Sequence, residues 1–336
     1  MGAVIQGVTR LGEPRGTAVA SPSAEAIGSA AAAQASAENF PVALRLLPGR
    51  YRRRLAAVYG FARAVDDMGD EAPPDERSHL LDELEADLGR LYQFQDPALR
   101  EAPALASPAQ DGPVQDSPVR EGTPAPGPPG DGPRIGVVRA LAEVVGECGV
   151  PQQVFADLIR ANRQDQVVTR YPAFSDLAGY CELSANPVGR IVLYVFGAAT
   201  PERMILSDRV CTALQLAEHW QDVAEDYQAG RIYLPAEDME RFGCAESDLA
   251  APSAGPQLRA LMAFEVERAG RLLDEGAPLV GNLHGSARVA VAGYVAGGRA
   301  ALAAIAAAGH DVLRATHKPR RGRLAREMLR AYAAGR

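Results

Sequence analysis

Residues 217–235 read AEHWQDVAEDYQAGRIYLP and place Glu218, Asp222 and Asp226 at intervals of four. Residues four apart in a helix lie on one face, so a helix here directs three carboxylates the same way. Like charges at this spacing destabilise a helix by about 0.2–0.5 kcal/mol per pair. Such an arrangement needs a compensating partner, and the rest of the chain indicates what that partner is.

A second stretch with the same spacing lies much earlier in the chain. Residues 59–71 read YGFARAVDDMGDE, in which Asp66 and Asp70 are four residues apart. If the two helices face each other, four carboxylates converge and repel strongly unless cations separate them. Mg²⁺ prefers carboxylate oxygens and keeps positions open for water and substrate phosphate. The paired stretches therefore predict Mg²⁺, or alternatively Mn²⁺, clamping a diphosphate. The other interpretation is that each pair is a solvated helix face.

The remaining sequence is predominantly helical in pattern. Leucines, valines and alanines recur at intervals of three and four over 52–71 and 76–93, and Pro73 and Pro74 separate these two segments. Further helices are expected at 136–148, 151–164, 174–197, 202–228, 256–275 and 286–313. We find no pair of alternating runs joined by a tight turn. The sequence thus predicts an all-α fold.

Two segments have compositions that disfavour a packed core. Residues 1–36 are rich in Ala and Ser and lack the order of a signal peptide, and 94–134 hold ten of the 25 prolines. We expect a disordered leader at 1–36 and a disordered insert at 94–134. Because acidic stretches lie on both sides of the insert, we predict one domain spanning 37–315, followed by a basic tail at 316–336.

Composition excludes several classes of partner and site. The net charge of −7 and the pI near 5.4 argue against binding to nucleic acid. The four cysteines form no CxxC pair and no HExxH occurs, which argues against a zinc site and favours free thiols in a reducing cytoplasm.

Two segments bear on membrane contact. The apolar run 286–309 contains Arg288, Arg299 and four glycines, so we predict a buried core helix in preference to a membrane span. The tail at 316–336 is basic with apolar residues on one face. A solvated terminal helix is the usual interpretation of this pattern, and peripheral contact with the inner face of an anionic membrane is the alternative.

The two acidic stretches and the run at 38–48 resemble those of a known family. The two acidic stretches are similar to the aspartate-rich motifs of squalene and phytoene synthases, in the same order and with RIY after the second. The run ENFPVALRLLP at 38–48 resembles the helix that lies over the active site in that family. The similarity covers roughly 38–93 and 136–315. It implies the all-α isoprenoid synthase fold, a helical bundle around a central prenyl cavity, and chemistry on prenyl diphosphates.

The resemblance also implies roles for individual residues. Asp66 and Asp70 would hold Mg²⁺ on one wall of the cavity, and Asp222 and Asp226 would do so on the other. Glu218 stands where the family usually has Asn, so its part in binding metal stays open. Residues expected to contact the substrate are Tyr59, Arg63, Arg190, Gln221, Arg231 and Tyr233, with Phe40, Asn186, Val188 and Gly189 lining the prenyl tunnel.

Three details resemble one branch, the hydroxysqualene synthases of bacterial hopanoid synthesis. NPVGR at 186–190 replaces a VAGxVG-like run, Gln221 stands where many relatives have Arg, and ENFP replaces a His/Ser-rich start. That branch is a carbon–oxygen lyase. It ionises presqualene diphosphate, rearranges the cation and captures it with water.

The branch carries further expectations. Functional coupling is expected with the synthase that supplies presqualene diphosphate and with the reductase that consumes hydroxysqualene, and no NADPH is expected. His219 is either a packed core histidine or a group that positions the capturing water. The alternatives are a synthase that condenses two farnesyl diphosphates to presqualene diphosphate, squalene or phytoene, and a non-catalytic helical scaffold.

Overall fold

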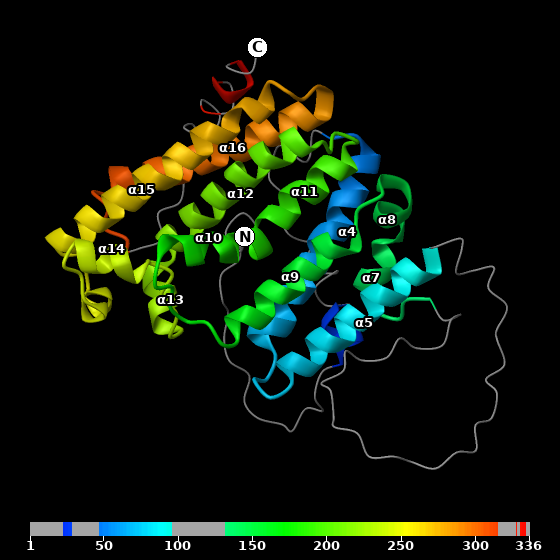
Figure 1. Cartoon of the computed structure of the whole chain (residues 1–336), viewed down its shortest axis with the longest axis horizontal. Coiled ribbons are helices and arrows are strands. Elements are labelled where there is room, and N and C mark those ends of the chain that lie inside the picture. The colour runs from blue at the N-terminus through cyan, green and yellow to red at the C-terminus, as the bar shows by residue number, and fades with distance from the viewer. Residues whose placement is uncertain (1–22, 29–46, 96–131, 315–326, 328–329, 334–336) are drawn as a thin grey trace, which may run out of the picture.

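The computed structural model describes residues 23–28, 47–95, 132–314, 327 and 330–333 (Figure 1). Within these ranges the chain is helical, with a single isolated bridge between Arg170 and Ile232, which confirms the predicted fold class. The α-helices are α4 (Gly49–Asp66), α5 (Arg77–Gln95), α7 (Gly136–Ala140), α8 (Ala142–Cys148), α9 (Gln152–Asp165), α10 (Phe174–Ser184), α11 (Asn186–Val195), α12 (Pro201–Gln221), α13 (Val223–Gln228), α14 (Ala236–Arg241), α15 (Pro256–Gly276) and α16 (Gly285–Ala307). A π-helical turn (Asp67–Glu71) follows α4, and 3₁₀ turns lie at Glu246–Ala250 and Ala277–Val280.

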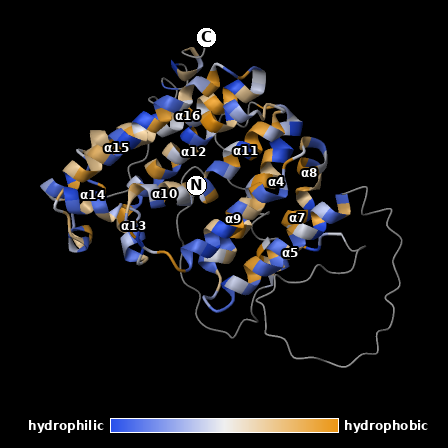
Figure 2. Cartoon of the chain, in the orientation of Figure 1, coloured by the Kyte–Doolittle hydropathy of each residue, from blue (hydrophilic) through white to orange (hydrophobic). Residues whose placement is uncertain are grey.

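The helices pack around two hydrophobic clusters. Trp220 of α12 is fully buried in one cluster, where α12 packs against α15 and α16. Phe61 of α4 and Phe155 of α9 meet edge to face in the other, with ring centroids 5.3 Å apart. Helix α11 joins the two because Leu193 belongs to the first cluster and Ile191 to the second. Figure 2 shows the resulting mixture of apolar and polar residues along each helix.

Three predicted helices are divided in the structure, the first of them 136–148, which is broken at Leu141 into α7 and α8. The segment 174–197 is broken at Ala185 into α10 and α11. Pro187 follows in the first turn of α11, where its missing N–H and its ring are tolerated, whereas inside a longer helix they would disrupt the preceding turn. The segment 202–228 is divided at Asp222, which is both the C-cap of α12 and the N-cap of α13. The prediction of single helices at these places was wrong.

Helix α16 is long and apolar enough to cross a membrane, with a mean hydropathy of 1.6. However, 56% of its most apolar window is buried inside the structure. Ala292, Val295 and Ala300 are completely buried, and α16 packs against α12 and α15. These contacts agree with the prediction of a core helix.

The predicted disordered segments fall largely outside the described residues, as does Phe40. Residues 24–28 of the expected leader are an exception, because they form a short helix whose Ala24 is buried. Glu25 accepts a hydrogen bond of 2.7 Å from the backbone N–H of Gly136. Helix α5 similarly continues to Gln95, inside the expected insert. At these residues the structure differs from the expectation because local contacts hold the chain in place.

Candidate active site

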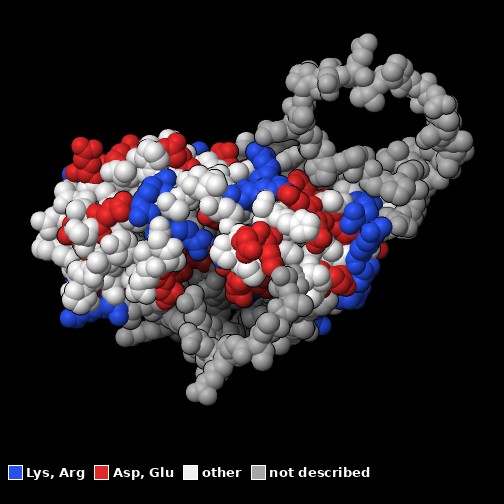
Figure 3. All heavy atoms as spheres, turned by 90° about the horizontal axis from the view of Figure 1, so that it is seen from below, with Lys and Arg blue, Asp and Glu red and all other residues white. Residues whose placement is uncertain are grey.

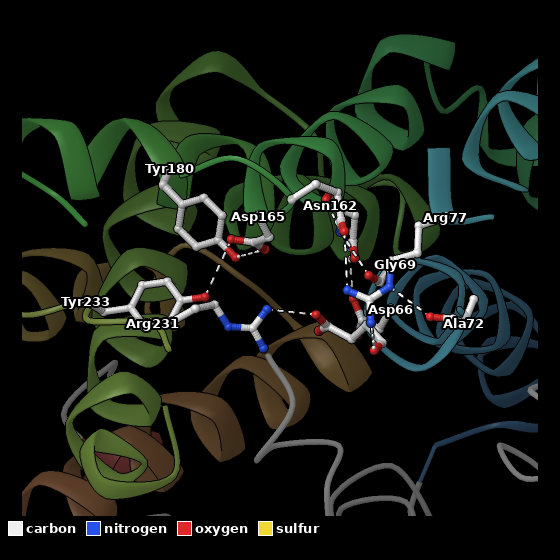
Figure 4. Close-up of polar contacts among 11 residues, drawn as sticks. Asp66, Gly69, Ala72, Arg77, Asn162, Asp165, Tyr180, Arg231 and Tyr233 are labelled. Atoms are coloured by element: carbon white, nitrogen blue, oxygen red, sulfur yellow. Dashed lines mark hydrogen bonds and ion pairs between the residues drawn. The ribbon is translucent and has the colours of Figure 1, made fainter. Parts of the chain in front are cut away.

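The first acidic motif lies where α4 passes into the π-helical turn. Asp66 is the last residue of α4 and is half-buried, whereas the side chain of Asp70 is 43% exposed. The side-chain amide of Asn162 on α9 donates to Oδ1 of Asp66 at 3.3 Å (Figure 4). Burial raises the pKa of Asp66 to about 6, and the negative charges of Asp70 and Glu218 contribute to the shift.

The second acidic motif spans the junction of α12 and α13. Glu218 is buried in the last turn of α12, and Asp222 and Asp226 are half-buried. The N–H of Asp222 donates to the carbonyl of Glu218 at 3.0 Å, and that of Asp226 donates to Asp222 at 2.8 Å. Helical spacing therefore persists across the break. Burial raises the pKa of both aspartates to about 7, and neighbouring carboxylates add to the effect.

The two motifs face each other. Arg231, which follows α13, donates to Oδ1 of Asp70 at 2.8 Å and so bridges the two walls (Figure 4). Its Nε is buried and has no hydrogen-bond partner among the residues that the structure describes. Acidic and basic side chains lie side by side around the middle of the face seen in Figure 3. The residues lining the adjoining pocket are His219, Val223, Asp226, Arg231, Ile232, Tyr233, Leu234 and Leu249.

An aromatic wall continues from this pocket into the core. The His219 ring stacks on Tyr233 with centroids 3.8 Å apart, and Tyr233 in turn stacks on Tyr171 at 5.7 Å. Gln215 places its side-chain amide nitrogen 3.2 Å from Nε2 of His219. Burial lowers the pKa of His219 well below its usual value, and the charge of Arg231 acts in the same direction. The imidazole is therefore neutral.

Asp165 at the end of α9 connects this wall to the acidic motifs. It accepts hydrogen bonds from the hydroxyl of Tyr180 at 2.6 Å and from that of Tyr233 at 3.4 Å. Burial raises its pKa to about 7. Sequence analysis missed Asn162, Asp165 and Tyr180. The sequence signal for Asn162 and Asp165 was weak. Two polar residues three apart near the end of an apolar helix are also typical of a helix end exposed to solvent.

Two of the predicted substrate-binding arginines are held in ion pairs. Arg63 donates to Asp67 at 2.7 Å and to Glu71 at 3.2 Å, so its guanidinium is directed to these residues. Arg190 donates to both carboxylate oxygens of Asp208 on α12, at 3.0 and 2.7 Å. Both arginines are therefore engaged with carboxylates of the protein.

The residues expected to line the tunnel at the start of α11 pack mainly against other helices. Asn186 is buried and accepts from the hydroxyl of Thr212 at 3.1 Å, while Val188 packs against the second cluster. A Cβ at Gly189 would overlap the Oγ of Ser207 and the Sγ of Cys211 on α12. The absence of a side chain at Gly189 thus permits close packing of α11 on α12. The expected role of Gly189 in lining a prenyl tunnel stays a prediction.

Tyr59, Gln221 and Tyr233 complete the predicted set. Tyr59 is half-buried on α4 one turn before Arg63, and Gln221 is buried at the end of α12. Tyr233 lines the pocket, and its contact with substrate stays a prediction.

The donor set suits a hard cation that binds few protein ligands at a time. Within the described ranges, no three His, Cys, Asp or Glu side chains gather as a closed metal centre. Mg²⁺ typically binds one or two carboxylates and fills its remaining positions with water and substrate phosphates. Two carboxylate pairs on facing walls match that habit. A cation would relieve the repulsion that, after burial, contributes to the raised pKa of Asp66, Asp222 and Asp226.

The helical bundle and its facing acidic motifs define an all-α isoprenoid synthase, a class of enzyme that acts on prenyl diphosphates. The crystal structure of squalene synthase HpnC from Alicyclobacillus acidocaldarius has a TM-score of 0.68 and 34% identity, covering 84% of this chain and 94% of that one. The family model described as squalene/phytoene synthase matches residues 33–326, and the chain belongs to that family.

Two relatives from Rhodopseudomonas palustris represent different steps in the family. Its hydroxysqualene synthase is 32% identical over 249 residues, which are 73% of this chain and 71% of the relative. Its presqualene diphosphate synthase is 30% identical over 232 residues, which are 69% and 70% of the two chains. The similarity therefore establishes the family, and the two relatives define the candidates for the reaction.

Proposed function

We propose that this protein is a Mg²⁺-dependent enzyme that converts presqualene diphosphate and water into hydroxysqualene and diphosphate. The single observation that carries the proposal is the pairing of Arg231 with Asp70 across two facing acidic motifs. Such a cleft combines carboxylates for cations with a guanidinium for phosphate oxygens. The choice of substrate rests on similarity to a hydroxysqualene synthase at 32% identity and on Gln221 beside Asp222.

In this proposal the acidic residues hold the cation and the arginine holds the leaving group. Asp66 and Asp70 bind Mg²⁺ on one wall, and Asp222 and Asp226 bind it on the other. The cation, when bound, stabilises the departing diphosphate. Arg231 contributes the N–H groups that Asp70 does not use, including its unpaired Nε.

The aromatic wall suits the carbocation that ionisation leaves behind. Tyr171, Tyr180 and Tyr233 pack together beside the pocket, and the quadrupoles of their rings add negative potential that attracts positive charge. His219 is neutral in this environment and therefore does not repel the cation. Capture of the cation by one water molecule, with loss of a proton from that water, then yields the alcohol.

The second candidate is the synthesis of presqualene diphosphate from two farnesyl diphosphates. The 30% identity to a presqualene diphosphate synthase favours it, and the same acidic cleft would serve it. The two candidates differ in the substrate that enters. They also differ in the fate of the cation, since only the first requires water as a reactant.

The experiment offers the purified protein presqualene diphosphate and farnesyl diphosphate separately, with Mg²⁺ and without NADPH. Products are identified by mass spectrometry. Formation of hydroxysqualene from presqualene diphosphate, with no conversion of farnesyl diphosphate, supports the proposal. Conversion of farnesyl diphosphate, with no conversion of presqualene diphosphate, supports the second candidate. Asp66→Ala and Asp222→Ala should abolish turnover, and Asp75→Ala, at an exposed loop aspartate, is the matched control. Full activity in the first two variants with an intact fold would exclude both candidates.

A further inference from the structure

The first acidic motif contains a local departure from the α-helix. Residues Asp67–Glu71 form a π-helical turn, and the N–H of Ala72 donates to the carbonyl of Asp67 at 3.0 Å, five residues back. Such turns are rare and occur frequently at functional sites. Asp66 lies just before the turn and Asp70 lies inside it, so the turn controls how the two carboxylates are placed.

Side chains from two other helices satisfy the carbonyl groups of this turn. Gln166, directly after α9, donates from Nε2 to the carbonyl of Gly69 at 2.8 Å. Arg77 at the start of α5 donates to the carbonyls of Asp70 and Ala72, each at 2.8 Å. Arg77 also donates to Oε1 of Gln166 at 3.3 Å. These contacts supply donors for carbonyls that the end of a helix otherwise leaves unpaired.

Gly69 allows a third side chain to reach the motif. A Cβ at Gly69 would overlap Oδ1 of Asn162, so only glycine leaves room for that amide. Asn162 is buried, and its amide nitrogen donates to Asp66 at 3.3 Å. Gln166 donates a further hydrogen bond of 2.9 Å to the carbonyl of Asn162, which links the two α9 contacts to each other. Figure 4 shows Asn162 and Arg77 beside the turn at Gly69.

We propose that Asn162, Gln166 and Arg77 form a clamp on the turn at Gly69 and thereby set the positions of Asp66 and Asp70 for metal binding. The inference rests on the proposed function, because it takes Mg²⁺ as the ion that these aspartates hold. The clamp residues act through the two aspartates as positioning residues. Contacts of this kind commonly account for about 10- to 100-fold in metal affinity.

The first test removes the donor of Gln166 without changing the length of the side chain. Gln166→Met loses the bonds to Gly69 and Asn162, whereas Gln153→Met changes an exposed glutamine on the same helix and is the matched control. Binding of Mn²⁺ in the presence of inorganic diphosphate is measured by electron paramagnetic resonance. We expect Gln166→Met to bind Mn²⁺ about tenfold more weakly than the wild type does. The control should bind as tightly as the wild type. The Mg²⁺ concentration for half-maximal turnover should rise in parallel, with kcat at saturating Mg²⁺ changing less.

The second test is a double-mutant cycle between Gly69→Ala and Asn162→Ala. Each change disrupts the same contact between Asn162 and Asp66, so we expect each to weaken Mn²⁺ binding by about tenfold or more. The double variant should be no weaker than Gly69→Ala alone. Losses that multiply in the double variant would overturn the idea that Gly69 acts by admitting Asn162.

Failure of the clamp and failure of the proposed function give different results. If the wild type binds Mn²⁺ and Asp66→Ala does not, but Gln166→Met matches Gln153→Met, the clamp is refuted and the metal site stands. If the wild type binds no Mn²⁺ with diphosphate and its turnover is independent of divalent cations, both are refuted. Circular dichroism at each step confirms that the variants are folded.

Discussion

A buried acidic residue away from the cleft makes a specific prediction about stability. Glu265 on α15 is completely buried and shares Arg268 with Asp238 of α14, at N–O distances of 3.0 and 2.7 Å. The guanidinium of Arg268 also lies 4.1 Å from the centre of the Phe174 ring. This cluster anchors α14 to α15. One arginine thus serves two buried carboxyl groups, which leaves the cluster with an excess of negative charge when both are ionised.

The sign of the pH dependence follows from this excess charge. Burial, together with the charge of Asp238 and against that of Arg268, raises the pKa of Glu265 from 4.5 to about 8. The folded chain therefore retains a proton that the unfolded chain releases, and stability falls as the pH rises from about 4.5 to about 8. At about 1.4 kcal/mol per pH unit the upper limit of the loss is about 5 kcal/mol. Structural relaxation and water reduce this, so we expect about 2 kcal/mol.

Urea unfolding of Glu265→Gln at pH 5.5 and pH 8.5 measures the effect. The wild type should lose about 2 kcal/mol more free energy of unfolding than Glu265→Gln between these two conditions. Other buried acids contribute equally to both proteins, so the difference isolates Glu265. Glu267→Gln changes an exposed glutamate on the same helix and should behave as the wild type. Identical pH dependence in the wild type and Glu265→Gln would refute the reasoning.

Three further predictions concern the cleft and its supports. Arg231→Met should raise the inhibition constant of inorganic diphosphate by about 10- to 100-fold, because a charge-assisted bond is lost; an unchanged constant would remove Arg231 from the site. Gly189→Ala should lower the free energy of unfolding by about 1–3 kcal/mol through overpacking, whereas Gly179→Ala, where a Cβ meets nothing within 4 Å, should not; equal effects in urea unfolding would contradict this. Asp165→Leu should lower the free energy of unfolding by about 1–3 kcal/mol, because it leaves the Tyr180 hydroxyl unpaired. The same change made in Tyr180→Phe should cost less, and equal costs in the two backgrounds would disprove the coupling.

The sequence predicts those parts of the site whose residues share a helix face at a spacing of four. Asp66 and Asp70, and likewise Asp222 and Asp226, are recognisable because repeated like charges on apolar helices are unfavourable without a ligand. The facing arrangement of the two motifs followed from the expectation that such charges need a shared cation. In the structure Arg231, which follows the second motif, donates to Asp70 of the first motif at 2.8 Å.

The parts that sequence alone misses depend on choices between neighbouring partners. Arg63 lies three residues before Asp66 and four before Asp67, so both are within reach on a helix. The structure pairs it with Asp67, at 2.7 Å. Gly189 could admit a ligand or another helix, and only the structure shows that α12 packs against it. Asp165 carries no spacing signal, because its partners come from α10 and from the chain after α13.

Both acidic motifs lie where a helix departs from its regular form. The first is in the π-helical turn after α4, and the second is at the break at Asp222 between α12 and α13. A regular helix would hold the Cβ atoms of each pair about 5–6 Å apart on one face, where like charges repel. At the second motif the i to i+4 bonds persist across the break, whereas the π-helical turn at the first motif leaves carbonyl groups that need other partners. At the first motif Gln166 and Arg77 are those partners, each at 2.8 Å. The irregular turn therefore depends on the side chains that bond to its carbonyl groups. A substitution in the turn or in these side chains should change the positions of the two aspartates.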